Sequence, residues 1–155
     1  MTRLEQAASP EAIAAARELF VEYQRAIGVD LCFQGFQAEV AGLPGAYAPP
    51  RGRLLLAWVD GRPAGCGVLR PLSGDAAEMK RMWVRPVFRG RGLGRAVAGA
   101  LLQAARAGGY ARVRLDTLPV MTEARALYRS LGFGVVPPYN DNPHPGAIHM
   151  ELALR

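Results

Sequence analysis

The stretch EMKRMWVRPVFRGRGLGRAV, residues 78–97, decides the fold that we expect for this chain. Its first half is a strand-like run, which Pro86 ends because proline has no backbone N–H to give to a sheet. Its second half opens a helix, since apolar residues recur from there at helical spacing: Leu93, Val97, Leu101 and Ala104. Between the two lies a turn rich in glycine and arginine, and glycine-rich strand-to-helix turns bind phosphates in several unrelated folds. The stretch therefore predicts a site for an anion.

The composition is that of one folded domain. The chain has 155 residues, 50% of them hydrophobic, which argues against disorder and predicts a single domain over residues 1–155. Nineteen Lys and Arg against thirteen Asp and Glu give a formal charge of +6, a balance that suggests an anionic ligand. The apolar runs are shorter than a membrane span, and the N-terminus lacks the apolar core of a secretory signal. We therefore expect a cytoplasmic protein that binds no membrane.

The segments on either side of the stretch alternate between strand and helix patterns. Two strand-like runs are joined across Asp60-Gly61, a strong hairpin signal, and the Pro/Gly-rich residues 43–52 predict a loop without regular structure. In chain order we expect strands and helices at Arg3–Gln6 (strand), Pro10–Ile27 (helix, capped by Ser9), 33–43 (short helix), Leu54–Val59, Ala64–Leu69 and Ala77–Val84 (strands), 92–107 (helix), 111–117 (strand), Thr122–Leu131 (helix), Phe133–Val136 and Ala147–Leu154 (strands). This order predicts a mixed α+β domain with a hairpin-rich first half and one βαβ unit in the middle.

A dinucleotide fingerprint is one alternative for the glycine turn. That fingerprint needs G-x-G-x-x-G/A at the start of a helix, and here Arg95 or Val97 would stand at its third glycine. Asp116 does end the next strand at about the separation of a ribose-binding acid. A single βαβ unit behind an antiparallel hairpin nevertheless cannot make a doubly wound sheet, and the P-loop pattern is absent from the sequence.

An RNA-binding Arg-Gly tail is a second alternative. Such tails are repeated and disordered, whereas this run is a single copy between a strand and a helix. We therefore expect no nucleic-acid partner.

The pattern Arg89-x-x-Gly92-x-Gly94 after an apolar strand resembles the acyl-CoA-binding signature [QR]-x-x-G-x-[GA] of the GNAT superfamily of acyl-CoA-dependent N-acyltransferases. EARALYRSLGF, residues 123–133, resembles the family's second signature, a helix with a Leu-Tyr pair that runs into Leu-Gly-Phe. One departure is Met121, which stands where the family often has an asparagine that contacts the pantetheine arm.

The resemblance implies a GNAT-like fold and activity. The fold would be a mostly antiparallel central sheet of six to seven strands flanked by about four helices, with the βαβ unit binding acyl-CoA. The activity would be N-acetyl transfer from acetyl-CoA, the cosubstrate, to a primary amine of a small-molecule or peptide acceptor, without a metal. The residues implied in acetyl-CoA binding are Met82, Trp83, Val84, Arg89, Gly90, Arg91, Gly92, Leu93, Gly94 and Arg95. Homodimers are common in the family, although no feature of this sequence requires one.

The resemblance also implies roles at the strand that precedes the turn. Backbone groups of Met82, Trp83 and Val84 would bind the pantetheine and the thioester oxygen. Glu78 lies where family members with a glutamate base carry it, and strand alternation predicts Glu78, Lys80, Met82 and Val84 on one face. An exposed residue at the start of the strand, without a catalytic role, is the equal alternative for Glu78.

Tyr128 occupies the position of the family's tyrosine that protonates the leaving thiolate, with a purely structural role in the core as the alternative.

Cys32 and Cys66 lie outside both signatures, so we expect two buried thiols and direct attack by the amine. His149 is expected to be a strand residue. A zinc site at His144 and Asp141 is rejected because further ligands are missing. Acceptor contacts are left open among Phe33, Gln34, Tyr47, Trp58, Tyr139, Asn140, Asp141 and His144.

The sequence thus predicts an N-acetyltransferase with an unidentified amine acceptor. The alternative is a non-catalytic acyl-CoA-binding or regulatory module on the same fold.

Overall fold

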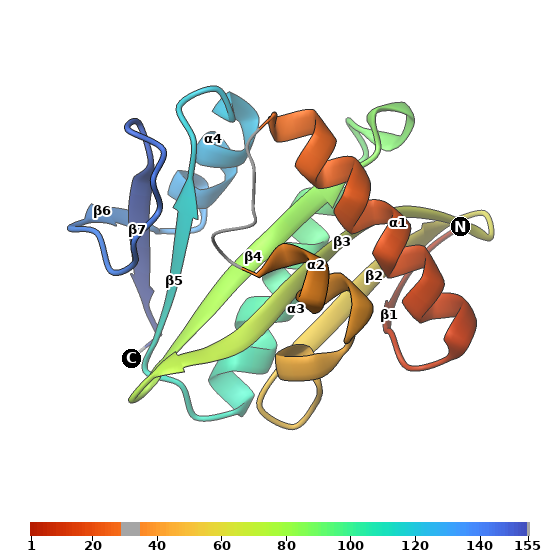
Figure 1. The fold of residues 1–155 in the computed structure, drawn as a ribbon, viewed down its shortest axis with the longest axis horizontal. Helices are drawn as coiled ribbons and strands as arrows, with labels where there is room; N and C mark the ends of the chain where they lie inside the picture. Colours follow the sequence, from red (N-terminus) through yellow and green to blue (C-terminus); the bar gives the residue numbers. More distant parts are fainter. Residues whose placement is uncertain (29–34, 155) are drawn as a thin grey trace.

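The computed structural model describes residues 1–28 and 35–154, which form a seven-stranded sheet with helices on both faces (Figure 1). The strand order is β1-β2-β3-β4-β5-β7-β6, and all neighbours run antiparallel except β4 and β5. The strands are β1 (Thr2–Gln6), β2 (Arg53–Val59), β3 (Arg62–Ser73), β4 (Ala76–Val84), β5 (Arg112–Thr117), β6 (Gly134–Val136) and β7 (Ile148–Ala153). The helices are α1 (Pro10–Ile27), α2 (Phe36–Ala41), α3 (Leu93–Ala107) and α4 (Thr122–Ser130), with 3-10 turns η2 (Gly45–Tyr47) and η3 (Pro86–Phe88). The α+β class and the mostly antiparallel sheet are confirmed.

Local sequence signals explain where the first half of the fold begins and turns. Ser9 caps α1 by accepting a hydrogen bond from the N–H of Ala12 at 3.1 Å, and Gly28 ends the helix in the left-handed conformation. Asp60 and Gly61 both have positive φ (50° and 79°), as a two-residue hairpin turn requires. The hairpin of β2 and β3 is therefore confirmed.

The segment 43–52 differs from its prediction. It contains the 3-10 turn η2, where Tyr47 is buried, instead of an entirely irregular loop. The apolar ring of Tyr47 packs edge-on against Phe20 of α1 (6.3 Å between centroids), and this contact holds the turn on the sheet.

Two hydrophobic cores lie on the two faces of the sheet. One core packs α3 and α4 against the sheet, with Val97 and Leu101 of α3 among its fully buried members. The other packs α1 and α2 against the opposite face, around Leu19 and Phe20. In Figure 1, α1 and α2 lie in front of the sheet and α3 behind it. No described helix combines the length and the apolar composition that a bilayer span takes.

The unit β4-α3-β5 is the predicted βαβ unit, but its two strands stay together only at one end. β4 and β5 pair in parallel over Ala76–Glu78 and Arg112–Arg114, and they are not paired beyond those residues. Figure 1 shows the two strands starting side by side and separating toward their carboxyl ends. This opening, which we call the fork, leaves one edge of β4 without a neighbouring strand among the described residues.

Candidate active site

A bulge in β4 sets which side chains face which side of the sheet. Arg81 has φ of 57°, and the pairing of β4 with β3 shifts register at this point, between Cys66 and Val68 of β3. The bulge inserts a residue, so alternation restarts behind it. Glu78 and Lys80 consequently face the side of α2, whereas Met82 and Val84 pack against the core of α3. The prediction that these four side chains share one face is wrong, because Arg81 breaks the two-residue period.

The backbone beyond the bulge also alternates in direction. The N–H of Arg85 donates to the carbonyl of Ala64 in β3 at 2.8 Å, so the N–H and C=O of Val84 point to the other edge, into the fork. By the same alternation the backbone groups of Trp83 point to β3. Met82 and Val84 thus remain the candidates for backbone contacts in the fork, and Trp83 presents its ring to Tyr23 of α1 instead (6.5 Å between centroids).

The glycine turn ends in an open helix N-terminus. Gly90 and Gly92 have φ of 82° and 77°, a conformation that favours glycine, and a Cβ atom added at either would meet open space. Gly92 is the N-cap of α3 and has no side chain to satisfy the first backbone donors. The N–H of Ala96 makes the first helical bond, to Gly92 at 3.0 Å, so the donors of Leu93, Gly94 and Arg95 precede the ladder. This arrangement attracts an anion.

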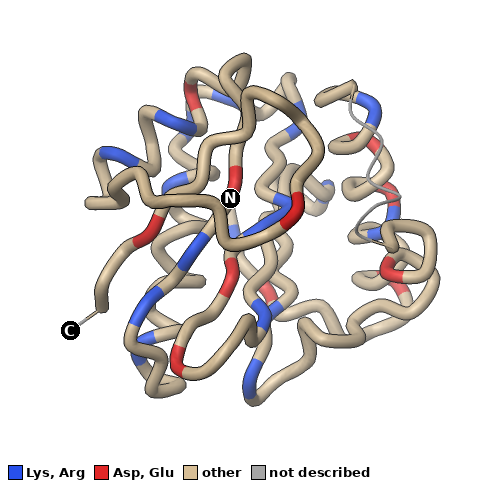
Figure 2. The backbone as a smooth tube through the Cα atoms, turned by 60° about the vertical axis from the view of Figure 1, so that its left-hand side comes forward, with Lys and Arg blue, Asp and Glu red and all other residues tan. Residues whose placement is uncertain are grey.

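Three exposed arginines surround the turn. Arg89 donates through Nε to the carbonyl of Val84 at 3.0 Å and lies over the Trp83 ring at 4.9 Å. Arg95 donates to the hydroxyl of Ser130 at 2.8 Å, and Arg91 lies 5.7 Å from the centroid of Phe88. Figure 2 shows that basic positions are spread over the described chain with acidic ones among them.

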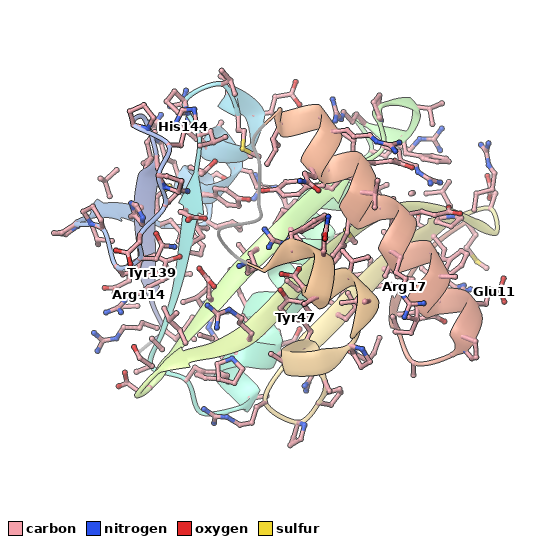
Figure 3. All side chains as sticks on the ribbon, in the orientation of Figure 1. Glu11, Arg17, Tyr47, Arg114, Tyr139 and His144 are labelled. Atoms are coloured by element: carbon pink, nitrogen blue, oxygen red, sulfur yellow. The ribbon has the colours of Figure 1, made fainter. Side chains whose placement is uncertain are left out.

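A cavity of about 640 Å³ lies on the other side of the bulge, between α2, η2, β3, β4 and the segment before β7. Its polar lining comes from widely separated parts of the chain: Glu39, Tyr47, Arg70, Glu78, Lys80, Asn140 and Asp141. In Figure 3, Tyr47 lies beneath α2, and Tyr139, which neighbours Asn140, lies beside Arg114 near β5 and β7.

Glu78 lies at the apex of the fork and is held by three groups. Arg70 donates to Oε1 through Nε and forms an ion pair through its terminal nitrogen, each at 2.8 Å. The hydroxyl of Tyr139 donates to Oε2 at 2.7 Å, and Nζ of Lys80 lies 3.7 Å from Oε1. Glu78 is only 2% exposed, so the interpretation of an exposed strand-start residue is wrong; the carboxylate is buried and bonded.

Glu39, which lines the cavity, forms an ion pair with the buried side chain of Arg81. The guanidinium of Arg81 donates to both carboxylate oxygens of Glu39, at 2.9 and 2.8 Å, and the Arg81 side chain is 2% exposed. Burial and, secondarily, the charge of Glu39 raise the pKa of Tyr47 well above its ordinary range. The bulge of β4 is thereby tied to α2 by a charged, bidentate contact.

The segment 139–146 is fixed on β5 and β7 by amide side chains. Asn140 and Asn142 donate to Oδ2 of Asp116 at 2.9 and 3.1 Å, and Nε2 of His149 lies 2.8 Å from Oδ1 of Asn140. His149 is buried in its strand, as expected, and His144 accepts a bond from the N–H of Gly146 at 3.1 Å. The network places Asn140 and Asp141 on the cavity.

Tyr128 is buried on α4 and packs edge-on against Phe133 (5.9 Å between centroids). Burial first, and then the nearby Tyr23 and Asp116, raise its pKa above the ordinary range. Within residues 1–28 and 35–154 its hydroxyl has no hydrogen-bond partner. Because its pKa is raised, the hydroxyl stays protonated and can donate a hydrogen bond.

The remaining predicted residues lie elsewhere. Cys66 is buried, and burial raises its pKa to about 12, which makes the thiol inert. Trp58 lies in β2 and donates to Glu5 in β1, away from the cavity. Cys32, Phe33 and Gln34 lie outside the described residues. Within the described ranges, no group of three or more His, Cys, Asp or Glu side chains is arranged to hold a metal ion.

Sequence reasoning missed Arg70 and Glu39. Each is defined by a partner far along the chain or across a strand, and neither lies in a motif. Only the alternation of β3 and the polar face of α2 could have pointed to them.

The sequence model of the Acetyltransferase (GNAT) family matches residues 13–133, which include the fork, the glycine turn and Tyr128. The chain belongs to this family. An uncharacterized N-acetyltransferase of Schizosaccharomyces pombe is 38% identical over 138 residues, covering 88% of this chain and 85% of that protein.

Solved GNAT structures share the fold. An acetyltransferase of the GNAT family from Staphylococcus aureus has a TM-score of 0.84 at 15% identity over the full length of both chains. The PaiA N-acetyltransferase of Thermoplasma acidophilum, solved in complex with coenzyme A, has a TM-score of 0.73 at 15% identity over 99% of both. The family match and the named relative make this GNAT chain an acyltransferase enzyme.

Proposed function

We propose that this GNAT enzyme transfers the acetyl group of acetyl-CoA to a primary amine by direct attack of the amine. The observation that carries the proposal is the juxtaposition of an open helix N-terminus with a forked strand edge. Both features can bind a ligand through backbone groups, and one follows the other directly in the chain.

The glycine turn fits the diphosphate of acetyl-CoA. The donors at the start of α3 and the positive end of its dipole favour phosphate oxygens, and the missing Cβ atoms of Gly90 and Gly92 leave room for them. Arg91 directly precedes Gly92, and Arg95 lies in the first turn of α3. Both side chains are therefore close enough to contact further phosphate groups. The related fold from Thermoplasma acidophilum holds coenzyme A, which supports this assignment.

The fork fits the pantetheine arm. Acetyl-CoA supplies an activated acyl group as a thioester. The backbone groups of Met82 and Val84 at the open edge of β4 orient the arm, and a backbone N–H there stabilises the carbonyl oxygen as negative charge develops on it. Such a donor typically contributes about 10²- to 10³-fold in rate.

Glu78 and Tyr128 carry out the two proton transfers of the reaction, one from the ammonium group and one to the departing thiolate. Glu78 lines the cavity at the apex of the fork and accepts the proton that the ammonium group loses. Tyr128 donates its hydroxyl proton toward the departing thiolate, since its raised pKa keeps it protonated and its hydroxyl has no partner among the described residues. The thiol inertness of Cys66 is consistent with direct attack instead of a covalent acyl-enzyme.

The test is release of coenzyme A thiol from acetyl-CoA in the presence of a panel of amines, with mass spectrometry of the products. The proposal expects thiol release that depends on both substrates and an N-acetylated product. Tight binding of acetyl-CoA without acetylation of any amine would contradict it.

A further inference from the structure

Tyr139 reaches Glu78 from the opposite arm of the fork. Glu78 is in β4, and Tyr139 belongs to the segment before β7, 61 positions further along the chain. Its hydroxyl donates to Oε2 of Glu78 at 2.7 Å. Glu78 and Arg114 are the last residues at which β4 and β5 pair, so this bond lies where the two strands begin to separate. It therefore joins the two arms of the fork at the proposed base.

The donors on Glu78 hold its carboxylate from both sides. Arg70 of β3 approaches Oε1 with two nitrogens, each at 2.8 Å, and Tyr139 donates to Oε2. A donor on each oxygen opposes rotation of the carboxylate about the last bond of its side chain. Each carboxylate oxygen has two acceptor positions, and the hydroxyl of Tyr139 takes one of those on Oε2. Because Glu78 lines the cavity, Oε2 can still accept a proton from a group bound there.

Tyr139 is itself held in place by β5 and β7. Its ring packs edge-on against His149 (5.2 Å between centroids), and the guanidinium of Arg114 lies 5.9 Å from its ring centroid. The next residue, Asn140, donates to Asp116 at 2.9 Å, and Nε2 of His149 lies 2.8 Å from Oδ1 of this asparagine. The position of the Tyr139 hydroxyl thus depends on two strands of the sheet.

The hydroxyl of Tyr139 stays protonated. Burial, and then the charges of Glu78 and Asp116, raise its pKa well above the ordinary range. A pH dependence that involves this tyrosine therefore arises at Glu78 or at the acceptor amine, and not at the phenol. The charged and titratable groups that surround the pair among the described residues are Arg70 of β3, Lys80 of β4, Arg114 and Asp116 of β5, His149 of β7, Glu39 of α2, Tyr47 of η2 and Asp141.

We propose that Tyr139 is a positioning residue, which holds the carboxylate of Glu78 where it takes the proton of the acceptor's ammonium group. This inference rests on the proposed function, because it concerns the base of that reaction. The proton moves from the nitrogen to Oε2; the nitrogen then forms the C–N bond as the C–S bond breaks, and Tyr128 protonates the thiolate. Tyr139 keeps its own proton throughout. A tyrosine with only a structural role would stabilise the segment 139–146 without affecting this transfer.

The first experiment is a double-mutant cycle of Tyr139→Phe and Glu78→Gln in the thiol-release assay, with the panel amine that gives the highest kcat/KM. Tyr139→Phe should lower kcat about 10- to 100-fold, because a small displacement of a reacting group costs rates of that order, and should leave the KM of acetyl-CoA unchanged. Once Glu78 is replaced by glutamine, adding Tyr139→Phe should lower kcat less than about twofold.

Three results of this cycle would count against the inference. Equal losses from Tyr139→Phe in the two backgrounds, or a full kcat in Glu78→Gln, would overturn it and leave acetyl transfer to an amine standing. The absence of thiol release with every amine would overturn the proposed function and the inference together.

The second experiment follows the loss of kcat in Tyr139→Phe as a function of pH. As the pH approaches the pKa of the acceptor amine in water, more of the amine is already neutral and needs no base. The loss should therefore be largest at low pH and shrink to less than about threefold near that pKa. A loss of the same size at every pH would show a structural role only and would overturn the inference.

Two further variants separate positioning from stability. Glu78→Asp retains the carboxylate but withdraws it by one methylene from the Tyr139 hydroxyl, so kcat should fall about as far as in Tyr139→Phe. Tyr110→Phe is the matched control: it loses a hydroxyl that donates to the carbonyl of Arg51 at 2.8 Å, and it should keep its kcat. Calorimetry with acetyl-CoA establishes that each variant is folded. Should Tyr139→Phe fail to fold, Glu78→Asp decides alone, and a full kcat in that variant would overturn the inference.

Discussion

The glycine turn and the cavity lie near the two ends of β4, and they differ in the groups that form them: backbone N–H groups form the turn, and side chains form the cavity. The turn is a run of consecutive residues whose backbone N–H groups face open space, with glycine at the positions where a side chain would interfere. The cavity is built from side chains of α2, η2, β3, β4 and the segment before β7, and two of its carboxylates, Glu78 and Glu39, are already paired with arginines. A change at the turn should therefore affect the ligand alone, whereas a change in the cavity should also affect the fold.

The largest effect is expected at the turn. Gly92→Asp places a negative charge where the diphosphate is proposed to bind, and two charges about 4 Å apart near a protein surface repel by about 4 kcal/mol, or about a thousandfold in affinity. Gly92→Asn is the matched control, because Asn and Asp tolerate the positive φ of this position equally. Calorimetry with acetyl-CoA should show the loss in the aspartate variant only.

The control for position uses the same helix. Gly99→Asp puts the same charge further along α3, where an added Cβ also meets open space. Equal losses of affinity in Gly92→Asp and Gly99→Asp would mean that the turn is not the anion site.

The cavity should respond in stability. Glu39→Gln leaves the guanidinium of Arg81, which is 2% exposed, without its charged partner, and breaking a buried pair destabilises by about 3 kcal/mol. Denaturant unfolding should show this loss while affinity for acetyl-CoA is retained. Glu5→Gln, at the exposed pair with Arg3, should lose less than about 1 kcal/mol. Similar losses of stability in Glu39→Gln and Glu5→Gln would contradict the claim that changes in the cavity also affect the fold.

The features that could be predicted from the sequence are local, and those that could not be predicted depend on tertiary contacts. The cap at Ser9, the hairpin turn at Asp60-Gly61 and the start of α3 are local, so the residues that cause them are adjacent in sequence. The bulge at Arg81 has no such signal, because arginine rarely adopts positive φ and tertiary contacts with Glu39 hold it there.

The cavity could not be predicted for a related reason. Its bonds join residues far apart in the chain: Tyr139 and Glu78 are 61 positions apart, and Arg81 and Glu39 are 42 apart. Glu78 could be singled out from its place before the turn, but its burial between Arg70 and Tyr139 depends on how the sheet brings three strands and a loop together. The sequence predicts the wrong face of the sheet for Met82 and Val84, because it gives no sign of the bulge at Arg81.

The smallest of the expected effects concerns Tyr128, which belongs to the catalytic step and not to either binding region. Tyr128→Phe should lower kcat about 10²-fold, the lower end for general acid catalysis, with little change in acetyl-CoA affinity. Its stability should be nearly unchanged, since the hydroxyl bonds to none of the described residues.

Tyr110→Phe is the matched control for that variant. Its hydroxyl donates to the carbonyl of Arg51 at 2.8 Å, so its loss should lower stability by about 1 kcal/mol and leave kcat as it is. If Tyr128→Phe instead lowers stability and retains kcat, the tyrosine is a core residue only.

A crystal structure of the chain with coenzyme A tests the central claim most directly. The account predicts the diphosphate against the N–H groups at the start of α3, and the pantetheine arm in the fork along Met82–Val84 of β4. A diphosphate bound elsewhere, or an arm that lies outside the fork, would contradict it.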